Sequence, residues 1–147
     1  NLYHLMKKQI LIVCFANYCR SPVAEYLLRA KYSDKFIVTS AGIAPKVVGK
    51  MDPRSQNYLS EIGIDNISHF PKKISLDLAS NSDYIFALDT FILLELNKRF
   101  TAYKNKIKML NFNSPSISLE DPYRMNDDDY RELMKNISKV VDSVELV

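Results

Sequence analysis

The 147-residue sequence has few of the features that mark secreted, membrane or nucleic-acid-binding proteins. It contains only two cysteines, Cys14 and Cys19, whereas a disulfide-stapled secreted scaffold carries more cysteines at wider spacing. No apolar run approaches the roughly 20 residues that span a bilayer, and residues 1–6 lack the pattern of a signal peptide. The net charge is only +3 and the basic residues are scattered. We therefore expect a cytoplasmic protein with no nucleic-acid partner and no membrane insertion.

Histidine is also scarce, with only His4 and His69 in the chain. The two histidines and two cysteines lie in unrelated segments and give no zinc-binding pattern, and they support a Cys-His or Ser-His hydrolase poorly. The acidic run 127–129 could bind a divalent cation, but at a predicted helix start such residues more often serve as favourable charges for the helix dipole. We expect neither a metal nor a cofactor.

The length and composition are those of one compact globular domain spanning residues 1–147, with 47% hydrophobic and 25% charged residues. Met6-Lys7-Lys8 is typical of a natural start. Residues Asn1–Leu5 are therefore interpreted either as an upstream or non-native extension or as native residues, and the sequence leaves both open.

Strand-like and helix-like segments alternate along the chain. Strands are predicted at Gln9–Cys14, Phe36–Ser40, Asp83–Leu88 and Ile107–Leu110, and helices from Pro22 to Ala30, from Asp52-Pro53 to Gly63, from Asp89 or Thr90 to Arg99, and from near Asp127 onward. Asn111–Asn126 is predicted to be a loop. This alternation predicts an α/β single-domain sandwich with a central, about four-stranded parallel sheet flanked by helices on both faces.

The segment Cys14–Pro22 follows the first predicted strand, at the carboxyl end where parallel sheets bind ligands. The five-residue gap between Cys14 and Arg20 lets successive backbone N–H groups point at one anion, and the next helix adds its positive end. Arg20 can grip two phosphate oxygens with its planar guanidinium. The alternative is a buried, inert cysteine and a surface arginine, and a Cys-x5-Arg pattern alone is weak. The buried strand before it and the Ser-Pro and helix after it favour an anion-binding nucleophile.

Two further residues of this segment have predicted roles. Ser21 could donate a hydrogen bond to the Cys14 sulfur and help it leave. Asn17 is expected to hold the loop in shape by side-chain hydrogen bonds to backbone groups.

The motifs of the chain resemble those of the low-molecular-weight protein tyrosine phosphatases. The resemblance begins at Val13–Glu25 and continues through the motifs Ser40-Ala41-Gly42, Asp52-Pro53-Arg54, Gly63-Ile64, Ser68-His69, Asp83-Tyr84-Ile85 and Glu120-Asp121-Pro122-Tyr123. It covers nearly the whole chain from Lys7 onward. Val48-Gly49-Lys50 and Asp121–Arg124 are most similar to the bacterial branch, whose members partner tyrosine kinases of polysaccharide export.

The resemblance implies hydrolysis of phosphotyrosine through a cysteinyl-phosphate intermediate, with Cys14 as nucleophile, Arg20 binding phosphate and Asp121 as general acid and base. It implies a phosphotyrosine protein as substrate, including a bacterial tyrosine autokinase, and a monomer or weak dimer. Substrate or phosphate contacts are expected from Phe15, Ala16, Asn17, Tyr18, Cys19, Ser21 and Tyr123, and His69 is expected to brace the loop through Asn17.

Four of these residues also have plain structural interpretations. Asp121 could be a turn residue before Pro122, Tyr123 a half-buried tyrosine and His69 a satisfied structural histidine. Cys19 could be a packing residue, whereas the resemblance implies a reversible disulfide with Cys14 that prevents overoxidation.

The chain departs from the family at several positions. Ala16 replaces a usual glycine, and if the loop needs positive φ there, the Cβ costs about 1 kcal/mol. Tyr18 is bulkier than the usual residue, and related arginine phosphatases have threonine there, which argues mildly against phosphoarginine. Arg124 and Lys46 fall at rim positions, so we expect a preference for acidic residues next to the phosphotyrosine.

Three rival functions share this loop. Arsenate reductases need downstream cysteines, and none follows Cys19. A sulfurtransferase with a persulfide on Cys14 would not need Asp121. A catalytically dead anion-binding or kinase-binding module is motivated by Ala16 and Tyr18, although all the chemical residues are present.

Overall fold

The computed structural model describes residues 7–45, 49–122 and 124–146. Its sheet has four parallel strands, β1 (Lys8–Cys14), β2 (Phe36–Gly42), β3 (Tyr84–Ala87) and β4 (Ile107–Met109), in the order β2-β1-β3-β4. The predicted α/β sandwich with a four-stranded parallel sheet is confirmed, and the strand ends differ from the predicted ones by at most two residues. The extension proposed at residues 1–5 lies outside the described residues.

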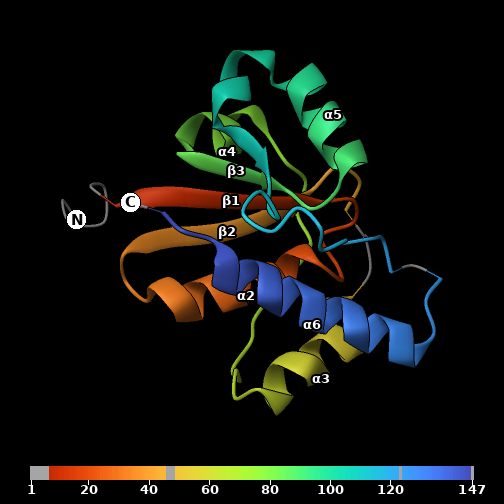
Figure 1. The fold of residues 1–147 in the computed structure, drawn as a ribbon. Coiled ribbons are helices and arrows are strands. Elements are labelled where there is room, and N and C mark those ends of the chain that lie inside the picture. The colour runs from red at the N-terminus through yellow and green to blue at the C-terminus, as the bar shows by residue number, and fades with distance from the viewer. Residues whose placement is uncertain (1–6, 46–48, 123, 147) are drawn as a thin grey trace.

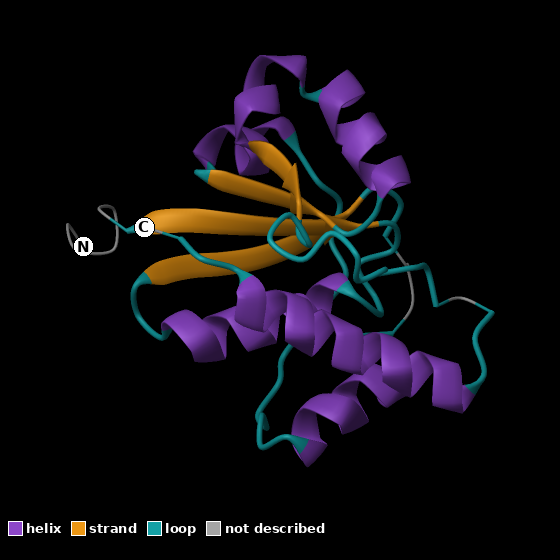
Figure 2. Ribbon diagram, in the orientation of Figure 1, coloured by secondary structure: helices purple, strands orange, loops and turns teal. Residues whose placement is uncertain are grey.

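Helices cover both faces of the sheet (Figures 1 and 2). One face carries α2 (Ser21–Tyr32), α3 (Pro53–Glu61) and α6 (Asp127–Ser143), and the other carries α4 (Leu76–Asn81), α5 (Thr90–Arg99) and the 3₁₀ helix η1 (Thr101–Lys106). The sequence analysis did not predict α4 and η1, because six residues are too few to show a helical period. Within the described part of the chain, no helix is both long and apolar enough to cross a membrane.

Two hydrophobic cores form because the side chains of β1 alternate between the faces of the sheet. Ile10 and Ile12 face α2 and α6, whereas Leu11 and Val13 face α4 and α5. The helix α6 contributes one apolar stripe, as its sequence pattern predicts: Tyr130, Leu133, Met134, Ile137, Val140 and Val141. A central strand buried on both faces fixes the position of the residue at its end, which is Cys14.

Helix caps account for the helix starts predicted from the sequence. Asp52 accepts a hydrogen bond from the amide of Arg54 at 2.8 Å, with Pro53 at the first helical position of α3. Asn126 caps α6 in the same way, so the acidic run 127–129 forms the first turn of that helix. Asp89 caps α5 through its Oδ1 atom, 2.9 Å from the amide nitrogen of Ile92.

Candidate active site

The loop after β1 curls around the sulfur of Cys14. The Cys14 side chain is only 2% exposed, and its Sγ atom lies 3.2 Å from the amide nitrogen of Asn17 and 2.9 Å from the hydroxyl of Ser21. A cleft of about 400 Å³ opens above it. The cleft is lined by Cys14, Phe15, Ala16, Tyr18, Cys19, Arg20, Asp121 and Pro122. The structure therefore brings the two motifs of the sequence, about a hundred residues apart, to one cavity.

The residue with positive φ in this loop is Asn17, at 52°, and not Ala16. The strain considered for Ala16 is therefore absent. Asparagine tolerates this conformation better than other non-glycine residues, because its short polar side chain makes local hydrogen bonds. Asn17 donates from Nδ2 to Ser21 at 2.8 Å and to Ser40 at 2.9 Å, and accepts at Oδ1 from the amide of Lys72 at 2.9 Å. The sequence predicted that the Asn17 side chain bonds to backbone groups. Of its three partners, only the Lys72 amide is a backbone group, and the other two are serine hydroxyls.

The hydrogen bonds of Asn17 leave the Ser21 hydroxyl able to donate to Cys14. The Lys72 amide can only donate, so the Asn17 atom facing it is the carbonyl oxygen and Nδ2 faces the two serines. Ser21 accepts from Nδ2, so its own hydroxyl proton is available to Cys14 Sγ, 2.9 Å away, and a thiolate at Cys14, which can only accept, would receive it. The loop therefore presents a backbone N–H and an O–H to the sulfur, and both would stabilise negative charge on it.

A buried carboxylate continues this network away from the cleft. Ser40 donates to Glu25 Oε1 at 2.6 Å, and Glu25 also pairs with Arg29 at 2.6 Å. Arg29 in turn donates to the carbonyl of Val38 on β2. The loop, α2 and β2 are thus tied together by charge-assisted hydrogen bonds, which are among the stronger polar contacts in proteins.

The end of β2 forms the floor of the loop and requires a glycine. A Cβ on Gly42 would lie 2.7 Å from the carbonyl oxygen of Phe15 and 2.9 Å from the amide nitrogen of Asn17. On another side of the loop, His69 Nε2 lies 2.7 Å from the carbonyl oxygen of Asn17. His69 is buried and contacts the loop through the residue at which the sequence analysis expected it to act.

Arg20 is only 2% exposed and is held by one edge of its guanidinium. Its Nη1 atom donates to Asp89 Oδ2 at 2.7 Å and to the carbonyl of Leu119 at 2.8 Å. Among the described residues, no fully buried side-chain nitrogen lacks a hydrogen-bond partner. Because both hydrogen bonds of Arg20 use Nη1, the Nε and Nη2 edge opens on the cleft, where a planar fork can bind two anion oxygens.

The other end of the cleft is formed by the loop before α6. Asp121 is exposed there and Pro122 is buried beside it. Tyr123, which was expected to contact the substrate, lies outside the described residues. Tyr18 lines the cleft, and its ring lies 3.5 Å from the position that a Cβ on Gly49 would take.

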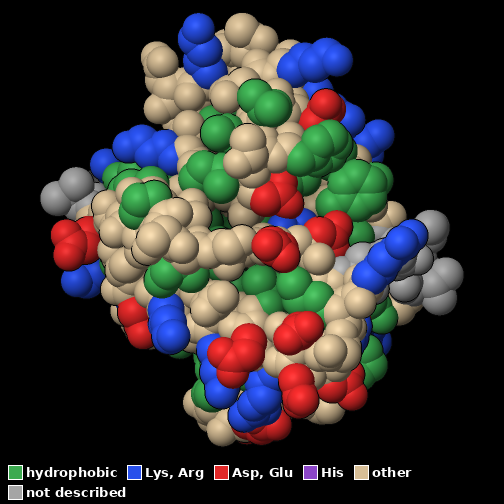
Figure 3. All heavy atoms as spheres, turned by 45° about the vertical axis from the view of Figure 1, so that its right-hand side comes forward, with side chains coloured by type: hydrophobic (Ala, Val, Ile, Leu, Met, Phe, Trp, Pro, Cys, Tyr) green, Lys and Arg blue, Asp and Glu red, His purple; other side chains and the backbone are tan. Residues whose placement is uncertain are grey.

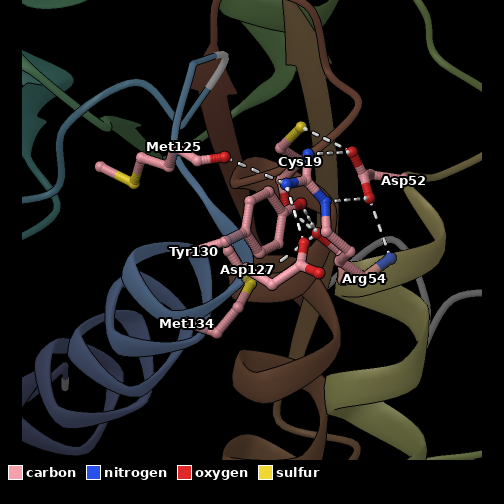
Figure 4. A network of polar contacts seen from close by, with 8 residues as sticks. Cys19, Asp52, Arg54, Met125, Asp127, Tyr130 and Met134 are labelled. Atoms are coloured by element: carbon pink, nitrogen blue, oxygen red, sulfur yellow. Dashed lines mark hydrogen bonds and ion pairs between the residues drawn. The ribbon is translucent and has the colours of Figure 1, made fainter.

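Cys19 lies on the cleft wall with its thiol turned toward a network behind the loop (Figure 4). Its Sγ atom donates to Asp52 Oδ2 at 3.7 Å, and its carbonyl accepts from Ser55 at 2.8 Å. Asp52 also pairs with Arg54, whose guanidinium lies 3.9 Å from the centre of the Tyr130 ring. Burial is the main cause that raises the pKa of the Cys19 thiol to about 12, and the Asp52 carboxylate adds to it. Both cysteines are free thiols in this structure.

The charges around the cleft are mixed. Arg124 lines a neighbouring depression together with the carboxylates of Glu120, Asp121, Asp129 and Glu132. Lys46 lies outside the described residues. The one described cation of the expected basic rim is therefore surrounded by acidic groups. In the part of the chain that the structure describes, no three His, Cys, Asp or Glu side chains are grouped as metal ligands would be.

Two groups of site residues were missed from the sequence. Asp89 was expected only as a helix cap, although it lies just after β3 at the same sheet edge as Cys14. Ser40 and Glu25 were not singled out for the site, because only the folded structure shows that the end of β2 and the first turns of α2 meet under Asn17. The position of Asp89 after a parallel strand was a signal that could have been used.

Comparison with known proteins agrees with this geometry. The family model described as low molecular weight phosphotyrosine protein phosphatase matches residues 9–144. The pig low molecular weight phosphotyrosine protein phosphatase is 34% identical over 134 residues, covering 84% of each chain.

Solved structures give the same result. The tyrosine phosphatase Wzb from Escherichia coli K30, solved in complex with sulphate, superposes with a TM-score of 0.85 at 26% identity, over 93% of this chain and 95% of that one. The YwlE arginine phosphatase from Geobacillus stearothermophilus superposes with a TM-score of 0.84 at 25% identity, over 92% of this chain and 89% of that one. A loop that carries a buried cysteine, a buried arginine and a loop aspartate are gathered at one cleft, and this chain belongs to the low molecular weight phosphotyrosine protein phosphatase family and is a phosphoric monoester hydrolase.

Proposed function

We propose that this enzyme hydrolyses phosphotyrosine in proteins through a cysteinyl-phosphate intermediate on Cys14. The observation that carries this proposal is the cleft in which the Cys14 sulfur, the open edge of Arg20 and the Asp121 side chain come together. In the first step the Cys14 thiolate attacks phosphorus and the phosphorus–oxygen ester bond breaks. Asp121 gives its proton to the departing phenolate oxygen.

In the second step, water replaces the enzyme at phosphorus. The Asp121 carboxylate takes a proton from the water, whose oxygen attacks phosphorus while the sulfur–phosphorus bond breaks. The thiolate of Cys14 leaves with the hydroxyl of Ser21 and the amide of Asn17 directed at it. Arg20 binds two of the phosphoryl oxygens through both steps, so that charge developing on them is compensated.

The decisive experiment compares aryl phosphate hydrolysis by the wild type, Cys14→Ser and Asp121→Asn. We expect near-total loss of activity for Cys14→Ser, and a loss of kcat of about 10²–10⁴-fold for Asp121→Asn, because general acid–base catalysis contributes this much. Glu120→Gln removes the neighbouring exposed carboxylate and serves as the matched control with unchanged kcat. Rapid acid quench should trap phosphate on the wild-type protein. Hydrolysis that persists in Cys14→Ser would overturn the mechanism.

Cys19 is proposed to form a reversible disulfide with Cys14 under oxidation. The support is that both residues line one cleft and that both are free thiols. After inactivation by hydrogen peroxide, the wild type should regain activity on addition of thioredoxin or dithiothreitol. Cys19→Ser should not regain it, because its Cys14 is oxidised further to sulfinic and sulfonic acid. Equal recovery by both proteins would remove the redox role.

The resemblance to the bacterial branch supports a tyrosine autokinase of polysaccharide export as a physiological substrate, and a reducing cytoplasm as the setting. The test is loss of phosphotyrosine from such a kinase on addition of the wild type and not of Cys14→Ser. Assaying phosphoarginine in parallel tests the substrate class of the structurally similar arginine phosphatase. The oligomeric state, proposed to be monomer or weak dimer, is measured by sedimentation.

A further inference from the structure

Large apolar side chains remain exposed beside the cleft. Phe15, a residue of the cleft wall, is 41% exposed, and Phe91, near the start of α5, is 55% exposed. Their ring centroids are 6.3 Å apart with the planes tilted by 47°, which is a favourable aromatic arrangement. Leu94, three residues after Phe91 and so on the same helix face, is 63% exposed. Figure 3 shows hydrophobic side chains gathered at the upper right of this face of the molecule. We call Phe15, Phe91 and Leu94 the apolar shelf.

The apolar shelf is held at a fixed place relative to the anion site. Asp89, two residues before Phe91, caps α5 with one carboxylate oxygen and pairs with Arg20 through the other. The start of α5 and the phosphate-binding arginine are therefore linked by a 2.7 Å ion pair. The shelf is continuous with the cleft, because Phe15 belongs to both.

We propose that the apolar shelf binds an aromatic or large aliphatic side chain of the substrate within two residues of the phosphotyrosine. This inference rests on the proposed function, since it assumes that a phosphotyrosine occupies the cleft. Neighbouring residues of an extended chain lie about 3.5 Å apart per position, so a side chain one or two positions away reaches rings that adjoin the cleft. An exposed apolar surface continuous with a binding site marks a place where apolar ligand groups bind.

The chemistry favours an apolar neighbour over a charged one. The shelf carries no charge, and the cation expected to attract acidic neighbours, Arg124, lines a depression together with four carboxylates. Covering two phenylalanine rings and a leucine removes apolar area from water, which is the main source of affinity at such a surface. The apolar shelf therefore contributes to substrate choice, and the preference for acidic neighbours expected from the sequence is the competing outcome.

The test uses pairs of phosphotyrosine peptides that differ only by Phe or Ser at one position, from two residues before the phosphotyrosine to two after. For wild type we expect kcat/KM to be about tenfold higher for Phe at one or more positions, which corresponds to about 1.4 kcal/mol. In Phe91→Ser this ratio should fall to about twofold or less, and Phe91→Leu should keep most of it. Ile62→Ser, which removes an exposed apolar side chain beyond α3, is the control that keeps the tenfold ratio.

Several results would overturn the inference. These are no Phe preference in the wild type, an unchanged ratio in Phe91→Ser, or a stronger preference for Glu than for Phe at every position. The wild type could prove to be a dimer that Phe91→Ser converts to a monomer, with the Phe-to-Ser ratio of kcat/KM unchanged. That result would mean that a second copy of the chain covers the shelf. A wild type that hydrolyses neither aryl phosphate nor any peptide contradicts the proposed function, whereas hydrolysis without a Phe preference contradicts only this inference.

Discussion

Asp89 joins Arg20 to the first turn of α5. One carboxylate oxygen of Asp89 lies 2.7 Å from Nη1 of Arg20, and the other caps the helix by accepting a hydrogen bond from the amide of Ile92. The nearly buried guanidinium of Arg20, the residue before α2, is thus oriented by the residue before α5. Rotation of the guanidinium would break a charge-assisted hydrogen bond, so the edge that faces the cleft is fixed before any anion binds.

Replacing Asp89 should separate its effect on the orientation of Arg20 from the effect of its negative charge on anion binding. In Asp89→Asn we expect kcat for an aryl phosphate to fall about tenfold to hundredfold, because a displaced group in an active site costs up to about this much. Binding of inorganic phosphate should stay equal or become tighter, because a negative charge near the anion is lost. Inhibition by phosphate and kcat measured on the same variant give both quantities.

The helix cap supplies the control for this prediction. Asparagine and serine are both good caps, so Asp89→Asn and Asp89→Ser should keep α5 and melt close to the wild type. A fall in kcat that tracks a fall in melting temperature across the two variants would assign Asp89 to stability alone. Unchanged kcat in both would show that Arg20 needs no such partner.

Gly42 should tolerate no side chain. In Gly42→Ala the new Cβ meets backbone atoms of Phe15 and Asn17 at 2.7 and 2.9 Å, so the loop around Cys14 must move. We expect loss of most activity together with a lower melting temperature. Crystallographic or NMR comparison of the loop, with kcat, checks this.

Gly63 is the matched control, because it has φ of +90° and open space around its Cα. Gly63→Ala should cost about 1 kcal/mol from backbone strain alone. That corresponds to about 2–4 °C in melting temperature. Its activity should be that of the wild type. A Gly42→Ala enzyme as active as Gly63→Ala would show that the loop is not supported by close contact with β2.

Asn17 combines an unusual backbone conformation with three side-chain hydrogen bonds, and two substitutions separate these contributions. Asn17→Gly keeps the positive φ and loses the hydrogen bonds, whereas Asn17→Ala loses both. Leaving buried partners unsatisfied costs about 1–3 kcal/mol each, so both variants should be destabilised and slow. The alanine variant should be the less stable by about 1 kcal/mol.

Asn66, which is exposed with φ of 60°, provides the comparison for the backbone alone. Asn66→Ala should cost about 1 kcal/mol in a denaturant titration with kcat unchanged. If Asn17→Gly were as active as the wild type, the orientation of Ser21 by Asn17 would have no part in turnover.

Cys19 should stay almost wholly protonated, and therefore react slowly, over the whole pH range in which the protein is handled. With its pKa raised to about 12, the thiolate fraction grows about tenfold per pH unit and has no plateau below that value. In Cys14→Ser, which leaves Cys19 as the sole cysteine, the rate of iodoacetamide labelling from pH 7 to 10 should follow a line of slope one on a logarithmic scale. The urea-unfolded chain should level off near the ordinary value of about 8.5. A plateau near pH 9 in the folded protein would contradict the buried position of this thiol.

The fold and the position of the site could be predicted because local patterns and topology agree. The strand before Cys14 is continuously apolar, and Asp52-Pro53 and Asp89 are strong helix starts. Parallel strands then require the ends of β1 and β3 to share an edge. The short elements α4 and η1 could not be predicted, because six residues carry too little periodicity.

The details of the loop depended on contacts between distant segments. The glycine usual in the family left open whether the loop has positive φ at Ala16. The backbone has it at Asn17, where the amide of Lys72 and two serines satisfy the side chain. No local pattern indicates that Ser40 and Glu25 stand beneath that residue. The ion pair of Arg20 with Asp89 likewise joins residues 69 apart.

The position of β1 between β2 and β3 has a consequence for how Cys14 meets reagents from solution. A strand hydrogen-bonded on both sides and buried on both faces opens only in the rarest fluctuations of a protein, those that approach complete unfolding. Oxidants and alkylating agents therefore reach this sulfur by diffusion through the mouth of the cleft and not by local unfolding of the sheet. If Arg20 binds an oxyanion as proposed, the bound anion blocks this path, and oxidation of Cys14 should slow as the anion concentration rises.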